Sequence, residues 1–312
     1  MVALLFPWVM CLLALFALVI FFKKHFLLGA IVLFISVGLN LWCKCFAFNF
    51  SEGDVDKRSV AFKVLTFNMN GEHESCSTTE RLNFILSQDA DIIFLAEDFY
   101  GICKEVDSVL KVSYPYSTYD YNLSHYFYSK YSLSTSARLA EDVDDRACVV
   151  KTVAKIGNDS ILLVGCHLSS NNYTKDYIDV RLLPFRERMG AYVESIQNAS
   201  QMRVQEAQTI CDNLGGYKTL VMGDMNDVCG SPCMRVFEKA GLKNAWWESG
   251  FGYGATIHKP LAYRIDHVLY SGGSSRFAGS RVSKGFKLIG IKKVSSKGLS
   301  DHDALVADFE IE

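Results

Sequence analysis

Two long apolar runs open the chain, and shorter apolar runs alternate with polar segments after them. Residues 1–22 and residues 26–43 contain no charged side chain, and the polar turn 23–25 separates them. A helix needs about 20 mostly apolar residues to span a bilayer. The pattern therefore predicts an N-terminal transmembrane helical hairpin in residues 1–43. The alternative, a cleaved signal peptide followed by one anchor, fits less well because no charged segment precedes the first run.

The charges around the hairpin bear on its orientation. Lys23 and Lys24 lie between the two apolar runs and favour a cytoplasmic loop, because basic residues are enriched on that side of membranes. Both ends of the hairpin, and the domain that follows it, would then lie on the extracytoplasmic side. Residues 44–60 contain the polar segment SEGDVDKRS and are expected to form a linker to a catalytic domain at 61–312.

The remainder of the chain carries apolar runs of strand length, most of which end in a polar residue. These runs lie at 61–71, 90–99, 147–157, 160–170, 217–227, 262–271 and 304–312. Continuous apolar runs of this length fit strands that are buried on both faces. Helices are expected between some of them, at 79–88, 188–213 and 232–240. We therefore expect an α/β fold, a four-layer α/β sandwich in which two packed mixed sheets are flanked by helices.

The polar residues at the ends of these runs are candidates for chemistry. They are Asn68, Glu97, His167, Asp224, Asn226 and Asp266, to which we add Asp301 and His302 from a turn just before the last run. Side chains alternate between the two faces of a strand, and strand ends that meet at one edge would gather these groups into a single cleft. Each residue alone also has a structural explanation: Asn68, Asp224 and Asp301 as turn or capping residues, Glu97 as a solvated strand end, His167 as a structural histidine, and Asp266 as a partner of Arg264. Asp227 points to the opposite face from Asp224 and is expected to be structural.

The order of these residues along the chain resembles a known family. The segments LAE, CHL, GDMN, RIDH and SDH, together with Asn68, resemble the motifs of the endonuclease/exonuclease/phosphatase superfamily, which has the deoxyribonuclease I-like fold. The resemblance runs from about residue 62 to the C-terminus. The segment GFGYGATIHKPLAYRIDHVLYS also resembles the bacterial, membrane-anchored members.

The resemblance implies a metal site. Glu97 would be the principal ligand of Mg²⁺, with Asn68 beside it and Asp301 as a further acidic group. Mn²⁺ and Ca²⁺ are the alternative ions. Carboxylate and amide oxygens suit Mg²⁺, which prefers hard ligands.

The resemblance also implies catalytic roles. Asp224 would orient or deprotonate the attacking water, and Asn226 would hold that water or a phosphate oxygen. His167 and His302 would bind the scissile phosphate and stabilise its additional charge. Asp266 would pair with one of the two histidines and select its tautomer; the resemblance leaves open which one.

Three positions depart from the family pattern without removing a catalytic side chain. Ala96 stands where a glutamine commonly precedes the metal-binding glutamate, Met225 replaces an aromatic residue, and Ala304 replaces a proline. Some members use a tyrosine before the middle strand, for which Tyr121 and Tyr126 are both candidates.

The charge balance bears on the class of substrate, and the cysteine content on possible disulfides. Three of the 32 basic residues and none of the 34 acidic ones fall within the first 50 residues, so the remainder has a formal charge of −5. This balance argues against a strongly basic nucleic-acid clamp. The chain has 10 cysteines, and Cys229 and Cys233 are close enough in sequence either to form a disulfide or to remain free thiols.

These observations predict a membrane-anchored, Mg²⁺-dependent phosphoester hydrolase, a phosphodiesterase or nuclease. The first alternative is a lipid head-group hydrolase, similar to sphingomyelinases or phosphoinositide phosphatases. The second is an inactive binding or scaffold domain. The expected partners are a phosphoester substrate, either nucleic acid or a phospholipid head group, and the lipid bilayer through the N-terminal helices. No protein partner is indicated.

Overall fold

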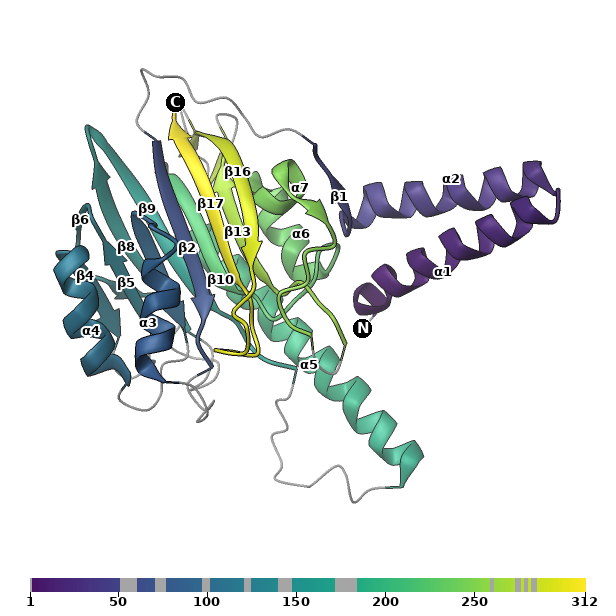
Figure 1. Ribbon diagram of the computed structural model, residues 1–312, viewed down its shortest axis with the longest axis horizontal. Coiled ribbons are helices and arrows are strands. Elements are labelled where there is room, and N and C mark those ends of the chain that lie inside the picture. Colours follow the sequence, from purple (N-terminus) through teal and green to yellow (C-terminus); the bar gives the residue numbers. More distant parts are fainter. Residues whose placement is uncertain are drawn as a thin grey trace.

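The protein consists of an α/β body from which a helical hairpin projects (Figure 1). The computed structural model describes residues 2–50, 61–70, 77–96, 102–120, 125–139, 148–171, 184–258, 261–272, 276–277, 280–281 and 285–312. The hairpin consists of α1 (Val2–Phe22) and α2 (Phe26–Cys43).

The body contains two mixed sheets. The six-stranded first sheet has the order β16-β17-β2-β3-β5-β4. Its strands are β2 (Ala61–Asn68), β3 (Ile92–Ala96), β4 (Tyr116–Asp120), β5 (His125–Ser129), β16 (Phe286–Val294) and β17 (Ala304–Ile311). The pair β2–β3 is parallel, and β17 runs antiparallel to β2.

The seven-stranded second sheet has the order β11-β13-β10-β9-β8-β6, and β7 also pairs with β8. Its strands are β6 (Ser132–Leu133), β7 (Ala137–Arg138), β8 (Cys148–Ile156), β9 (Asp159–His167), β10 (Lys218–Asp224), β11 (Leu242–Asn244) and β13 (Asp266–Ser271). Here β9 and β10 are parallel. Two small two-stranded sheets pair β1 (Ala47–Phe48) with β12 (Phe251–Gly252) and β14 (Arg276–Phe277) with β15 (Ser280–Arg281).

Three buried apolar layers hold the sheets and helices together. The layer between the sheets includes Phe94 and Met222. A second layer lies between the first sheet and α3 (Thr78–Leu86) and α4 (Ile102–Ser113). A third lies between the second sheet and α5 (Phe185–Asp212) and α6 (Pro232–Lys239), and the short helix α7 (Ala245–Ser249) closes one side. This arrangement confirms the predicted four-layer α/β sandwich.

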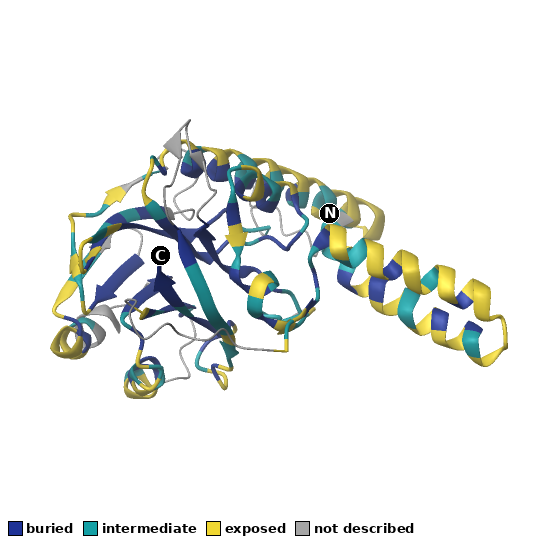
Figure 2. Ribbon diagram, turned by 90° about the horizontal axis from the view of Figure 1, so that it is seen from above, coloured by how far each residue is buried: buried dark blue, intermediate teal, exposed yellow. Residues whose placement is uncertain are grey.

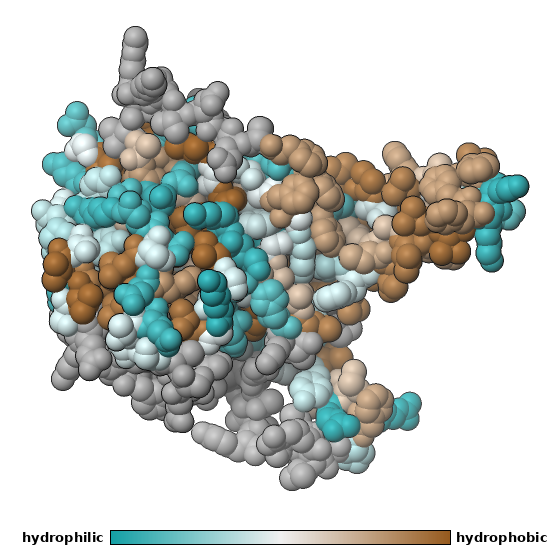
Figure 3. Space-filling model, viewed as in Figure 1, coloured by the Kyte–Doolittle hydropathy of each residue, from teal (hydrophilic) through white to brown (hydrophobic). Residues whose placement is uncertain are grey.

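The hairpin has the length and composition of a membrane-spanning element. The stretches Ala3–Phe22 and Phe26–Cys43 have mean hydropathies of 2.8 and 2.2, and only 22% and 17% of these windows are buried. Figure 2 shows the hairpin as predominantly exposed, and Figure 3 shows its apolar surface with a polar outer tip. Within the expected linker, β1 pairs with β12, so the chain packs onto the body directly after the hairpin.

Candidate active site

Three candidate residues lie side by side at one edge of the second sheet. Asp224 ends β10 and stands opposite His167 at the end of the parallel strand β9. On its other side, Asp224 stands opposite Asp266, the first residue of the antiparallel strand β13. Directly opposed residues on neighbouring strands share a face of the sheet, so strand register brings the three polar groups together.

The two sheets approach each other closely behind these residues. The ring of Phe94 in β3 packs against Gly165 and Gly223, where a Cβ atom would lie 2.1 Å and 2.9 Å from the ring carbons. Gly223 also has φ +135, and a Cβ atom there would lie 2.0 Å from the carbonyl oxygen of Cys166. Glycine at both positions therefore allows the end of the first sheet to reach the acids of the second.

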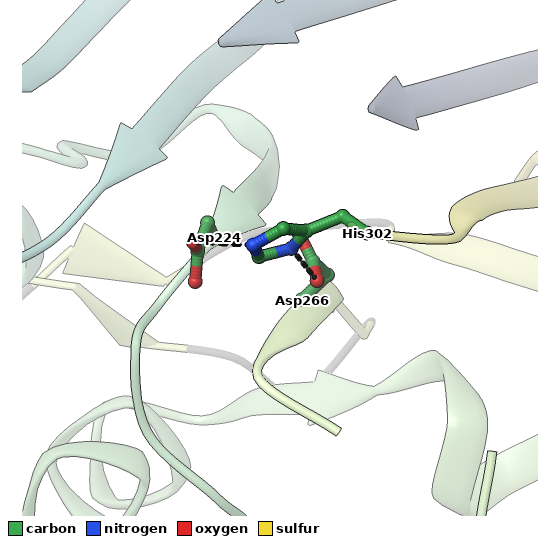
Figure 4. Close-up of side chains that lie close together, drawn as sticks. All are labelled: Asp224, Asp266 and His302. Carbon is green, nitrogen blue, oxygen red and sulfur yellow. Dashed lines mark hydrogen bonds and ion pairs between the residues drawn. The ribbon is translucent and has the colours of Figure 1, made fainter. Parts of the chain in front are cut away.

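Asp266 pairs with His302, which resolves the choice between the two histidines. The Nδ1 atom of His302 lies 2.8 Å from Oδ2 of Asp266, and its Nε2 atom lies 3.8 Å from Oδ2 of Asp224. In Figure 4 the imidazole ring lies between the two carboxylates. We refer to Asp224, Asp266 and His302 as the acid–base cluster.

Burial and mutual charge shift the pKa values within this cluster. Burial and the neighbouring Asp266 raise the pKa of Asp224 to about 6, although His302 and His167 oppose the rise. Burial alone would lower the pKa of His302, but Asp266 and Asp224 outweigh it and raise that pKa to about 10. At neutral pH the cluster therefore holds an ionised Asp224 beside a protonated imidazole.

Asp224 accepts hydrogen bonds from both sheets. The backbone N–H of Asn226 donates to its Oδ1 at 2.8 Å, and the side-chain amide of Asn68 donates to its Oδ2 at 3.2 Å. Asn226 has φ +49 and donates its own side-chain N–H to the carbonyl of Leu168 at 2.8 Å. This turn keeps Asn226 at the site, and the side-chain amide nitrogen of Asn226 holds the loop after β9 through its hydrogen bond to Leu168.

The loop before β13 positions both members of the Asp266–His302 pair. The hydroxyl of Thr256 accepts the backbone N–H of Asp266 at 3.2 Å, and the carbonyl of Thr256 accepts that of Asp303 at 2.7 Å. Ile257 forms an isolated bridge to His302. Sequence analysis did not single out Thr256, because its role depends on contacts that join distant segments.

A second imidazole accompanies His167. His167 Nε2 lies 3.9 Å from Oδ2 of Asp224, and its ring stacks on that of His125 with centroids 5.9 Å apart. His125 begins β5 and is 2% exposed. Sequence analysis missed it, although it lies two residues before Phe127, which faces the layer between the sheets. Tyr126 instead packs beneath α3 and α4, away from the site, and Tyr121 lies outside the described residues.

Oxygen atoms gather beside the acid–base cluster at the end of the first sheet. The backbone N–H of Asn70 donates to Oδ1 of Asn68 at 3.0 Å, and its side-chain amide donates to Oδ1 of Asp301 at 2.9 Å. The hydroxyl of Ser300 donates to the carbonyl of Asn68 at 2.8 Å. We refer to Asn68, Asn70 and Asp301 as the oxygen cluster; Glu97, the expected principal metal ligand, lies outside the described residues.

The oxygen cluster fits a hard divalent cation. It offers an amide oxygen from Asn68 and a carboxylate from Asp301, whose side chain is 41% exposed and thus reachable from solvent. Asp224, Asp266 and His302 also place one ligand atom each within 4.8 Å of one another. A protonated imidazole nitrogen cannot coordinate a cation, so the raised pKa of His302 makes the acid–base cluster the poorer fit for a metal.

Asp227 takes part in a buried network behind the site. Its Oδ2 accepts a hydrogen bond from Nε of Arg203 at 3.1 Å, and Arg203 also donates to the carbonyl of Ser169 at 2.8 Å. Glu206 accepts the backbone N–H of Ser169 at 3.1 Å, and burial raises its pKa. These contacts fasten α5 to the loops after β9 and β10, in keeping with the expected structural role of Asp227.

Cys229 and Cys233 are free thiols.

Solved structures share this architecture at low sequence identity. Humanized D. rerio TDP2 aligns with a TM-score of 0.57 and 13% identity, covering 80% of this chain and 98% of that one. Truncated Caenorhabditis elegans TDP2 aligns with a TM-score of 0.55 and 17% identity, covering 80% and 97%. Sphingomyelinase C from Streptomyces griseocarneus aligns with a TM-score of 0.54 and 17% identity, covering 80% and 99%. These likenesses show the fold.

Sequence comparison identifies the family. No curated protein matches the chain. The family described as Endonuclease/Exonuclease/phosphatase matches residues 65–302, a span that runs from β2 to His302 and includes the acid–base cluster. The chain belongs to the Endonuclease/Exonuclease/phosphatase family.

Proposed function

We propose that the protein is a membrane-anchored, Mg²⁺-dependent hydrolase of phosphoester bonds. The observation that carries the proposal is the position of Asp224, whose Oδ2 lies between the imidazole of His302 and the amide of Asn68. The family match supports phosphoester hydrolysis as the reaction class. A carboxylate with a pKa near 6, beside a protonated imidazole, suits attack of water on phosphorus.

Each residue of the acid–base cluster then has a distinct task. Asp224 accepts the proton of the attacking water at Oδ2. His302 and His167 donate hydrogen bonds to the non-bridging phosphate oxygens as negative charge builds up on them. Asp266 keeps His302 protonated and orients its Nε2 atom toward the reacting group. Asn226 holds the water or a phosphate oxygen.

Asn68, Asp301 and Glu97 would hold Mg²⁺, with Mn²⁺ or Ca²⁺ as alternatives. When bound, the ion would neutralise charge on the phosphoryl oxygens. Asn70 orients two of these ligands, because it donates hydrogen bonds to the oxygens of both Asn68 and Asp301.

The test uses the full chain in detergent with bis(p-nitrophenyl) phosphate as substrate. We expect turnover with Mg²⁺, loss of turnover with excess EDTA, and recovery when Mg²⁺ is restored. An equal rate with and without EDTA would refute metal dependence. Absence of turnover across phosphodiester and phosphomonoester substrates would favour the alternative of an inactive binding domain.

The hairpin favours a lipid head group over nucleic acid as the substrate. Its two helices would place the body at a bilayer, and the remainder of the chain is acidic. The D. rerio TDP2 structure contains a single-strand DNA product, whereas the S. griseocarneus protein is a sphingomyelinase C. Parallel assays with single-stranded DNA, RNA, sphingomyelin and phosphoinositides would decide between the two classes.

We further propose that the body lies on the extracytoplasmic side, with Lys23 and Lys24 in the cytoplasm. Protease added to intact spheroplasts of an expressing bacterium should then digest the body. Protection of the body until the membrane is broken would reverse the orientation.

A further inference from the structure

Exposed aromatic side chains surround the base of the hairpin. Trp8, Trp42, Phe48, Phe50 and Phe251 are exposed here, and we refer to them as the aromatic collar. The rings of Phe48 and Phe50 contact that of Phe251, with centroids 6.3 Å and 5.4 Å apart. Aromatic residues concentrate where membrane proteins meet the head-group region. The collar therefore marks the level at which the body meets the bilayer.

Polar contacts fix the direction of the hairpin relative to the body. Lys44, directly after α2, forms an ion pair with Glu238 of α6, and its carbonyl accepts a hydrogen bond from Arg264 at 3.2 Å. The guanidinium group of Arg235 lies 4.4 Å from the ring centroid of Trp42. Because these contacts are made at the end of α2, the faces of the body that reach the bilayer are determined by the fold.

The start of α5 presents an apolar stripe that the body does not cover. Phe185, Met189 and Tyr192 are 71%, 46% and 44% exposed, and their spacing places them on one face of the helix. In contrast, Ala207 and Ile210 near the other end of α5 are buried against the second sheet.

This start of α5 lies on the side of the body from which the hairpin projects. Figures 1 and 2 show α5 extending beyond the sheets in that direction. Arg186 and Arg188 flank the stripe, with Glu187 between them, and the Arg188 guanidinium lies 6.0 Å from the ring centroid of Phe185. A helix with aromatic and aliphatic residues on one face and arginines beside them suits the interface of a bilayer that contains anionic lipids.

We propose that the start of α5 lies in the head-group region of the same bilayer that the hairpin spans. This inference rests on the proposed membrane anchor. The body then rests on the bilayer at two separate places, the aromatic collar and the stripe Phe185–Met189–Tyr192. These two contacts prevent the body from tilting about the hairpin and hold the catalytic edge in one orientation relative to the lipid surface.

The test measures lipid contact without using activity. The full chain, labelled with 5-fluorotryptophan, is placed in nanodiscs of phosphatidylcholine and phosphatidylglycerol. Phe185→Trp adds a fluorine resonance on the stripe. Val112→Trp adds a control resonance on α4, at a site that is 85% exposed and on the side of the body away from the hairpin. Trp42→Phe identifies the native resonance from the collar.

We expect nitroxide-labelled lipid to broaden the resonances from positions 185 and 42 and to leave that from position 112 unchanged. A water-soluble nickel chelate should broaden the resonance from position 112 most strongly. The inference is overturned if position 185 responds like position 112 while Trp42 is broadened by the lipid. Failure of the lipid label to broaden Trp42 would overturn the anchor itself, and the inference with it.

Discussion

The acid–base cluster and the oxygen cluster adjoin each other but differ in exposure. Asp224 and Asp266 are each 2% exposed, whereas the side chain of Asp301 is 41% exposed. Burial raises the pKa of Asp224, whereas the neighbouring carboxylates raise the pKa of His302 against the effect of burial. In the second cluster the carboxylate of Asp301 is accessible to an ion from solvent, whereas Asn68 is as buried as the two acids. The two clusters meet at Asn68, whose amide nitrogen faces Asp224 while its amide oxygen faces Asn70.

The largest loss of activity is predicted for substitution of Asp224, the central acid of the acid–base cluster. Asp224→Asn preserves shape but removes the proton acceptor, so we expect kcat to fall by about 10²–10⁴-fold. Steady-state kinetics at saturating Mg²⁺ would measure this loss. Asp212→Asn, at the exposed end of α5, is the matched control and should leave kcat unchanged. A fall of less than threefold at position 224 would refute its role as the base.

A larger residue at Gly223, where the two sheets approach each other behind the acid–base cluster, should destabilise the protein. Gly223→Ala forces a strained φ and a contact with the carbonyl of Cys166, so we expect the free energy of unfolding to fall by about 1–3 kcal/mol or more. Thermal unfolding of the full chain in detergent would show a lower midpoint. The control Gly190→Ala lies in α5, where a Cβ atom meets nothing within 4 Å, and should not lower the midpoint. Equal midpoints for the two variants would contradict the packing argument.

A substitution in the oxygen cluster should change the affinity for Mg²⁺. Asn70→Ala removes the side-chain hydrogen bond that orients Asp301, so the Mg²⁺ concentration for half-maximal activity should rise about 10–100-fold. The rate at saturating Mg²⁺ should largely recover. A titration of activity against Mg²⁺ would measure both quantities, with Asn83→Ala on the exposed face of α3 as the control. A reduced rate at saturating Mg²⁺ with unchanged affinity would place Asn70 in the acid–base chemistry instead.

Sequence alone predicted the strands that are mostly apolar. The runs at 61–71 and 217–227 correspond to β2 and β10, and the last run corresponds to β17. It missed β5 and β16. The first has only five residues, and the second is an edge strand that pairs with β17 and contains three lysines. Apolar content identifies a strand only where both faces are buried.

The site was predictable where strand ends carry the chemistry, and less so where turns complete it. Strand patterns located Asp224, His167 and Asp266, which strand register then brings together. Asn70 escaped notice because it occupies a turn with φ +39 and acts by orienting its neighbours. The pairing of Asp266 with His302 also required the structure, because it depends on how the two sheets pack.

The smallest effect that we predict concerns pH and tests whether the charge of Asp266 shifts the pKa values of both Asp224 and His302. In the native protein the rate should rise as pH passes about 6, where Asp224 loses its proton, and fall near pH 10, where His302 loses its proton. Asp266 raises both of these pKa values, so Asp266→Asn should move both limbs of the profile to lower pH. Asp89→Asn, in an exposed ion pair with Lys130, should move neither limb. If Asp266→Asn moved only the acidic limb, His302 would not be the group that titrates on the alkaline side.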